Sequence, residues 1–157
     1  MSSEENNKKG RNVLVRLLRT GETVDVPASG LSMFPFLLPT DVLRVRPVSA
    51  ENLKRGQIIV YENFQKIISH RYIKTKDSKV ICKGDGLLHI DQPFDPASVL
   101  GVVVARTRKG RTLNLETNFF FVTGRIMSYV TGFTGIFFHY LGRAWYKWVF
   151  SKKSRDL

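Results

Sequence analysis

The feature that most constrains the fold of this chain is a series of short strand-like runs between residues 23 and 115, separated by turn residues. Residues 41–46 (DVLRVR) alternate apolar and charged side chains, as a half-buried strand does, and residues 57–61 (QIIVY) are apolar, as a buried strand is. Further strands are expected at residues 23–27, 66–73, 79–83, 99–106 and 112–115. No helical pattern separates these runs, so the sequence predicts a mostly antiparallel, compact, curled sheet with a hairpin turn at Lys109-Gly110.

The N-terminal region has a different pattern. Residues 12–19 place apolar side chains at helical spacings, with Gly21 just beyond them, and predict a short helix. Residues 1–11 are polar and charged, and we expect a disordered, solvated tail without a signal peptide or membrane anchor. A length of 157 residues suits one domain. We place it at residues 12–115 and expect a mostly β fold of the α+β class.

Residues 116–157 are aromatic and basic and predict an amphipathic C-terminal helical tail. Between Arg125 and Arg143 run 17 residues without Asp, Glu, Lys or Arg, whereas a membrane span needs about 20 apolar residues. Trp145 and its aromatic neighbours favour the headgroup level of a bilayer. Three placements stay open: a span, a helix on the membrane surface, and a helix packed on the domain. We expect residues 119–150 to bind an anionic, cytoplasmic membrane face without crossing it.

The charge balance indicates an anionic partner. The chain holds 25 Lys and Arg against 13 Asp and Glu, a formal charge of +12. Nucleic acid is not the expected partner, because only about 20 residues precede the first strand and they hold no helix-turn-helix pattern. One cysteine, Cys82, excludes an internal disulfide, and we expect it to be a buried apolar residue. The three histidines are scattered, so neither a metal site nor a cofactor is expected.

The segment SGLSMFPFL, residues 29–37, is the most informative motif. Gly30 allows a backbone geometry that other residues resist, so the turn can present the hydroxyl of Ser32 as a nucleophile. The backbone N–H of Ser32 can then face a developing oxyanion. Met33 and Phe34 follow the serine, and we expect them to pack beside it or to line a shallow apolar substrate site.

Several further blocks follow this motif in a fixed order, and together they resemble the signal peptidase I superfamily, which includes the self-cleaving LexA-type repressors. The resemblance covers about residues 22–106. The blocks are Ser29–Pro35, Asp41–Leu43, Gly56–Val60, His70–Ile73, Lys83–Asp85 and Leu100–Val103. The resemblance implies the fold of that superfamily and a serine peptidase activity.

The resemblance also implies the roles of individual residues. His70 stands where bacterial members have a lysine base, which is similar to the Ser-His type of archaea and the endoplasmic reticulum. Asp91 follows Asp85 by six residues, as the acidic residue of that type does. The implied constellation is Ser32 as nucleophile, His70 as base and Asp91 orienting the imidazole, with Asp85 in support. His89 and Asp95 lie close to Asp91 in sequence and stay open as alternatives.

The expected function is that of a serine endopeptidase that performs limited, site-specific cleavage of a leader or precursor peptide near a membrane surface. The peptide would add as an extended strand to a sheet edge near Ser32. Two alternatives stay open: a catalytically silent, peptidase-like module that binds peptides or membranes, and a LexA-type regulator.

Overall fold

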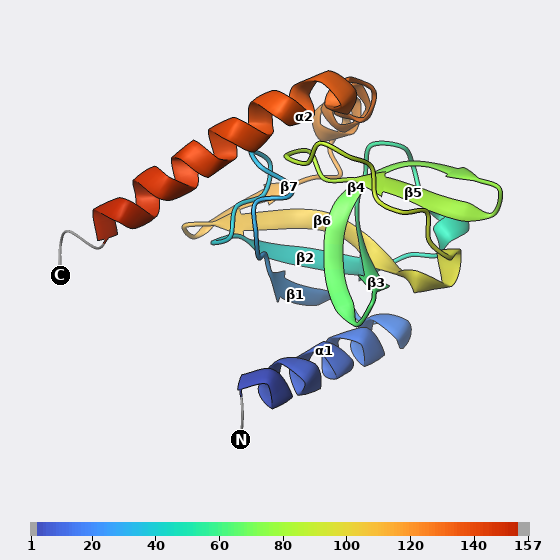
Figure 1. Ribbon diagram of the computed structural model, residues 1–157. Helices are drawn as coiled ribbons and strands as arrows, with labels where there is room; N and C mark the ends of the chain where they lie inside the picture. Colours follow the sequence, from blue (N-terminus) through green and yellow to red (C-terminus); the bar gives the residue numbers. More distant parts are fainter. Residues whose placement is uncertain (1–2, 154–157) are drawn as a thin grey trace.

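A computed structural model describes the backbone of residues 3–153 and the side chains of residues 5, 7–130 and 137–147. Within this part of the chain, seven strands form one antiparallel sheet, with the order β1-β2-β6-β3-β4-β5 and with β7 paired to β6 (Figure 1). The strands are β1 (Val24–Pro27), β2 (Val42–Pro47), β3 (Ile58–Asn63), β4 (Lys66–Lys76), β5 (Lys79–Lys83), β6 (Val99–Arg108) and β7 (Arg111–Asn114). The fold is therefore α+β with an antiparallel sheet, as the sequence predicts.

The strand predictions agree closely with the structure. The predicted bounds of β5 are confirmed, and the other strands shift by a few residues at their ends. The turn between β6 and β7 lies at Lys109 and Gly110, with φ angles of 48° and 76°. Two successive residues in the left-handed region are what a two-residue hairpin turn of type I′ requires. The hairpin prediction at this position is confirmed.

The N-terminal helix is longer than predicted. Helix α1 runs Ser3–Arg19, so residues 3–11 are helical and not a disordered tail, while residues 1–2 lie outside the described part. Glu5 precedes Lys9 by four residues, a spacing that stabilises helices. Arg11 donates a hydrogen bond of 2.7 Å to the carbonyl of Gln65 in the β3–β4 turn. This tertiary contact holds a segment that has no apolar pattern of its own.

Two apolar clusters lie on opposite faces of the sheet, because successive residues of β3 point in opposite directions. Ile58 and Val60 belong to the cluster under α1, together with Leu18 of that helix. Ile59 and Tyr61 belong to the other cluster, together with Cys82. The predicted burial of Cys82 is confirmed.

Helix α2 (Asn118–Lys153) is one continuous helix that lies on the other side of the sheet from α1 (Figure 1). Its first turns pack on the loop before β3, where Gly124 meets the backbone of Gly56. Farther along, Trp145 packs against Phe34 with ring centroids 5.9 Å apart. Within the described residues, no helix is long and apolar enough to cross a membrane. The part of the expected membrane contact beyond Lys147 falls on side chains outside the described ones.

Two short 3₁₀ turns complete the described elements. They are η1 (Ala50–Asn52) before β3 and η2 (Pro96–Ser98) before β6. Asp95 begins the second turn and accepts a hydrogen bond of 2.9 Å from the backbone N–H of Ala97.

Candidate active site

His70 and Asp91 form a hydrogen-bonded pair at one end of the sheet. Nδ1 of His70 lies 2.7 Å from Oδ2 of Asp91. The side chains of both residues are largely buried, with exposed fractions of 7% and 14%. An ionised carboxylate only accepts hydrogen bonds, so Nδ1 is the donor and carries the ring proton of a neutral imidazole. Nε2 is then the nitrogen that can accept a proton.

Tyr61 is a third member of this group that the sequence patterns do not predict. Its hydroxyl donates a hydrogen bond of 2.8 Å to Oδ2 of Asp91 and lies 3.3 Å from Nδ1 of His70. The ring stacks on Phe94 with centroids 4.0 Å apart. Burial and the charge of Asp91 raise the pKa of the Tyr61 hydroxyl, so it stays protonated and remains a donor. We name Tyr61, His70 and Asp91 the His-Asp-Tyr cluster.

The strand register explains why these three side chains meet. In the β3–β4 hairpin, Ile59 pairs with His70 and Tyr61 pairs with Ile68, so Tyr61 and His70 lie on the same face of the sheet. Asp91 is held at the far side of β5, because its backbone N–H donates to the carbonyl of Cys82 at 2.9 Å. No pattern in the sequence marks Tyr61, because only the register of the β3–β4 hairpin decides which residues share the face of His70.

The other residues near Asp91 in sequence do not join the cluster. His89 is exposed. Asp95 is exposed, caps the 3₁₀ turn at Ala97 and lies 3.5 Å from the ammonium group of Lys79. Of the open alternatives, Asp91 is therefore the one that contacts His70.

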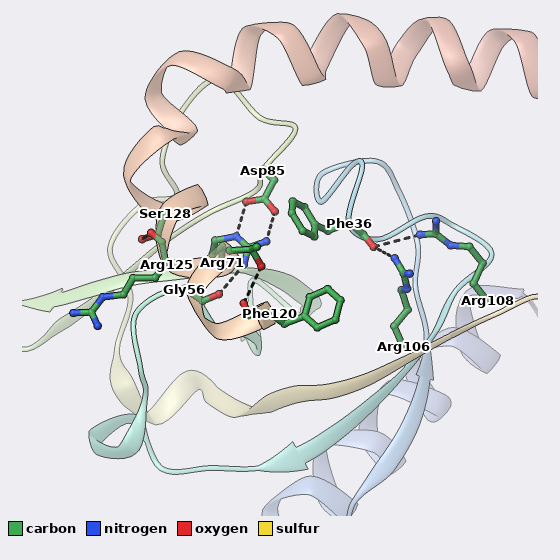
Figure 2. Close-up of polar contacts among 10 residues, drawn as sticks. Phe36, Gly56, Arg71, Asp85, Arg106, Arg108, Phe120, Arg125 and Ser128 are labelled. Carbon is green, nitrogen blue, oxygen red and sulfur yellow. Dashed lines mark hydrogen bonds and ion pairs between the residues drawn. The ribbon is translucent and has the colours of Figure 1, made fainter. Parts of the chain in front are cut away.

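Asp85 lies in a different network from the one expected. It is fully buried and accepts two hydrogen bonds from Arg71, at 2.8 Å from Nε and 2.5 Å from Nη2. Figure 2 shows Asp85 over the guanidinium of Arg71, whose Nη1 also donates to the carbonyl of Gly56. Arg71 follows His70 in β4 and points to the opposite face of the sheet. The expected support of His70 by Asp85 is thus replaced by an ion pair that fixes β4 to neighbouring loops.

Ser32 lies in the loop between β1 and β2, half-buried, and is anchored through its main chain. Its carbonyl accepts a hydrogen bond of 2.9 Å from the backbone N–H of Gly86. Gly84, just after β5, approaches so closely that a Cβ there would lie 2.5 Å from the same carbonyl. The loop of Ser32 is therefore joined to the segment that connects β5 with Asp91. Among the described residues, no hydrogen bond links the hydroxyl of Ser32 to His70.

The residues around Ser32 take different places. Gly30 has a φ of +79°, which confirms the expected use of a glycine at this turn. Met33 is buried in the cluster under α1, and Phe34 is buried beneath α2, so both are packing residues here. A cavity of about 240 Å³ opens at Ser32. Its lining is Leu31, Ser32, Gly86, Leu87, Phe138, His139 and Arg143, so that α2 forms one side of it.

A larger cavity of about 490 Å³ lies on the Arg71 side of the sheet and contains neither Ser32 nor His70. Each cationic side chain that lines this cavity already contacts another group of the protein. Arg71 pairs with Asp85, and Arg55 donates to the hydroxyl of Ser128 at 2.8 Å. Arg46 pairs with Glu116 at 2.6 Å, and Lys54 lies 5.5 Å from the centre of the Phe121 ring. We therefore place the candidate active site at Ser32 and the His-Asp-Tyr cluster.

A comparison with protein-family models and with curated proteins finds no match to this chain. Assignment of the site therefore depends on its own chemistry. Among the described residues, no group of three or more His, Cys, Asp and Glu side chains is arranged to hold a metal ion.

Two titratable groups at the end of β5, Cys82 and Lys83, have shifted pKa values. Burial raises the pKa of the Cys82 thiol, and the nearby charge of Asp91 acts in the same direction, so the thiol stays neutral. Burial lowers the pKa of Lys83, while Asp85 opposes that change. Lys83 pairs in register with Arg71, on the strand position next to His70. Lys83 directly precedes Gly84, which lies against the carbonyl of Ser32, and the tests below therefore include it.

Proposed function

We propose that this chain is a serine endopeptidase in which Ser32 is the nucleophile, His70 is the general base and Asp91 orients the imidazole. The single observation that carries the proposal is the buried hydrogen bond of 2.7 Å between His70 and Asp91, two residues that lie 21 positions apart. A second donor, the Tyr61 hydroxyl, holds the same carboxylate oxygen at 2.8 Å. A carboxylate with two fixed donors keeps the imidazole in one tautomer and one orientation.

The proposed reaction follows from this tautomer. With the proton on Nδ1 bonded to Asp91, Nε2 removes the proton of the Ser32 hydroxyl as the oxygen attacks a peptide carbonyl. The imidazolium is stabilised by the carboxylate and then gives its proton to the leaving amine. A water molecule, with His70 again acting as the base, then attacks the acyl-enzyme, and breaking the ester bond to Ser32 restores the free serine. The backbone N–H of Ser32 is the candidate oxyanion donor.

The sheet offers an edge for an extended substrate next to His70. Strand β5 pairs with β4 only from Arg71 onward, whereas β3 pairs with β4 along Lys66–Arg71. Within the described part of the chain, residues 66–70 of β4 thus have a strand on one side only. A peptide that adds along this edge runs directly to His70, and its main chain supplies the affinity. We propose that the substrate is an extended leader or precursor segment, cut at one site.

The alternative is a module with this fold that binds peptides and does not cleave them. The discriminating experiment treats the protein with a serine-reactive phosphonate and maps the adduct by mass spectrometry. The proposal expects one adduct, on Ser32. The Ser32→Ala variant should then remain unlabelled and keep the thermal midpoint of the wild type, because a half-buried hydroxyl contributes little stability.

The matched control is Ser29→Ala, which removes an exposed hydroxyl from the same loop and should label like the wild type. An adduct that persists in Ser32→Ala contradicts the assignment of the nucleophile. A folded wild-type protein that takes no adduct and cleaves no peptide in an unbiased peptide mixture favours the silent module.

A further inference from the structure

Helix α2 presents large apolar side chains to solvent in both of its described parts, residues 118–130 and 137–147. Six of them, spaced three or four residues apart within each part of the helix, have exposed fractions of 55–68%. They are Phe119, Val122, Ile126, Tyr129, Phe137 and Tyr140. We name this row the outer face of α2. Soluble proteins seldom leave contiguous aromatic and aliphatic side chains in water without a partner.

The opposite side of the helix is already occupied by the domain, so the helix cannot turn to bury its outer face. Gly124 sits against the backbone of Gly56, where an added Cβ would lie 2.6 Å from the carbonyl oxygen. Ser128 is buried and accepts a hydrogen bond of 2.8 Å from Arg55. Near the other end, Gly142 lies against Phe34. These small residues let α2 approach the domain closely and direct its bulky side chains outward.

The charges of α2 indicate what covers the outer face. Between Asn118 and Lys153 the sequence contains five Lys and Arg and neither Asp nor Glu. Arg125, Arg143 and Lys147 are exposed, so cationic groups lie beside the aromatic row. The inner face of α2 is packed on the domain, its outer face is apolar, and its flanks are cationic. A helix of this kind suits the surface of an anionic bilayer, where apolar side chains enter the lipid and cationic groups contact the headgroups. The formal charge of +12 on the whole chain acts in the same direction.

We propose that the outer face of α2 docks in the plane of an anionic bilayer while the inner side of the helix stays on the domain. The docked helix also forms one side of the cavity at Ser32, through Phe138, His139 and Arg143. The same helix would then hold the candidate active site at the bilayer surface. This last consequence rests on the proposed function, whereas bilayer docking does not.

The test measures co-sedimentation of the full chain with vesicles of phosphatidylcholine, with and without phosphatidylglycerol. We expect binding only to the vesicles that contain phosphatidylglycerol, with release as the salt concentration rises. The double variant Phe137→Ser/Tyr140→Ser should weaken binding by about tenfold or more, because it removes two aromatic side chains from the apolar contact. The matched control is Phe64→Ser, which removes an aromatic ring that is 85% exposed in the β3–β4 turn.

Absence of binding to the phosphatidylglycerol vesicles would overturn the proposal, as would equal losses in the double variant and in Phe64→Ser. A stable dimer in solution that Phe137→Ser/Tyr140→Ser converts to monomer would overturn it in favour of a second copy of this chain. Circular dichroism of each variant checks that the fold is intact. Ser32→Ala should bind vesicles like the wild type, so failure of the peptidase assignment and failure of docking give different results.

Discussion

His70 and Arg71 are consecutive residues of β4, and their side chains enter separate networks on opposite faces of the sheet. His70 bonds to Asp91 beside the Tyr61 hydroxyl, whereas Arg71 bonds to Asp85 and to the carbonyl of Gly56. The alternation of a strand imposes this division. One residue carries the proposed chemistry, and its neighbour carries the attachment of β4 to the surrounding loops.

Substitutions within the His-Asp-Tyr cluster should reduce activity in a fixed order. Asp91→Asn keeps the shape of the side chain and removes the charge that fixes the imidazole tautomer, so we expect a loss of about a thousandfold in kcat/KM. Tyr61→Phe removes one of two donors to that carboxylate, and we expect a loss of about tenfold. Peptide-cleavage kinetics measure both. A larger loss in Tyr61→Phe than in Asp91→Asn would contradict the proposed roles.

The identity of the base can be tested by comparing two basic residues in adjacent strands. His70→Gln should abolish turnover, because an amide cannot accept the proton of the Ser32 hydroxyl. Lys83→Met should retain most of the activity if Lys83 is not the base. Steady-state kinetics on folded variants give the comparison. An inactive Lys83→Met beside an active His70→Gln would assign the base to Lys83.

The strands of the sheet could be predicted from the sequence. The alternating runs predict the strands, because half-buried strands need period-2 patterns. The contacts of Asp85 and Tyr61 could not be read in the same way. Asp85 lies close to the site in sequence, but it contacts Arg71 and not His70. This contact depends on the face of β4 from which the Arg71 side chain projects, which the sequence alone does not reveal. Tyr61 reads as an ordinary core residue until the hairpin register is known.

The extent of α1 also lay beyond the sequence pattern. Residues 3–11 have no apolar periodicity, and Arg11 attaches their helix to the sheet through an ion pair with Glu62 and a hydrogen bond to the carbonyl of Gln65. Such a contact between residues 54 positions apart leaves no local signal.

Removing Arg71 should strongly destabilise the fold. In Arg71→Met, the fully buried carboxylate of Asp85 and the carbonyl of Gly56 both lose their partner. Breaking one side of a buried ion pair costs about 3–5 kcal/mol in the free energy of unfolding. Urea denaturation of Arg71→Met measures this loss, and the double variant Arg71→Met/Asp85→Leu should recover a large part of it. A loss as large in the double variant would show that the pair itself contributes the stability.

Stability should fall at alkaline pH. Burial raises the pKa of the Cys82 thiol and of the Tyr61 hydroxyl, so both groups stay protonated in the folded state while they ionise in the unfolded chain. The stabilisation by Cys82 decreases as the pH rises above about 9 and that by Tyr61 as it rises above about 10, by about 1.4 kcal/mol per pH unit for each group. Thermal unfolding at several pH values measures the slope. Cys82→Ala should show a shallower decrease from the start of this range, whereas an unchanged slope would contradict the contribution of Cys82.

Two glycines should respond to alanine in opposite directions. In Gly124→Ala the new Cβ would lie 2.6 Å from the carbonyl oxygen of Gly56 and 2.9 Å from Nη1 of Arg71. We expect a loss of about 1–3 kcal/mol from this overpacking. Gly10→Ala in α1 meets no atom within 4 Å and should gain about 0.5–1 kcal/mol from its helix propensity. A thermal midpoint that stays unchanged or rises in Gly124→Ala would contradict the close approach of α2 to Gly56.

The carbonyl oxygen of Ser32 fixes the position of this residue. It accepts a hydrogen bond from the backbone N–H of Gly86, and it fits against Gly84 because that residue has no Cβ. The side chain at position 32 can therefore be changed without changing the backbone contacts that hold the loop. A different reactive group, such as the thiol of Ser32→Cys, could be installed there and would report the reactivity of its surroundings independently of folding. Position 32 can therefore hold different small side chains in the same place, because the backbone and the two glycines, Gly84 and Gly86, determine where that side chain lies.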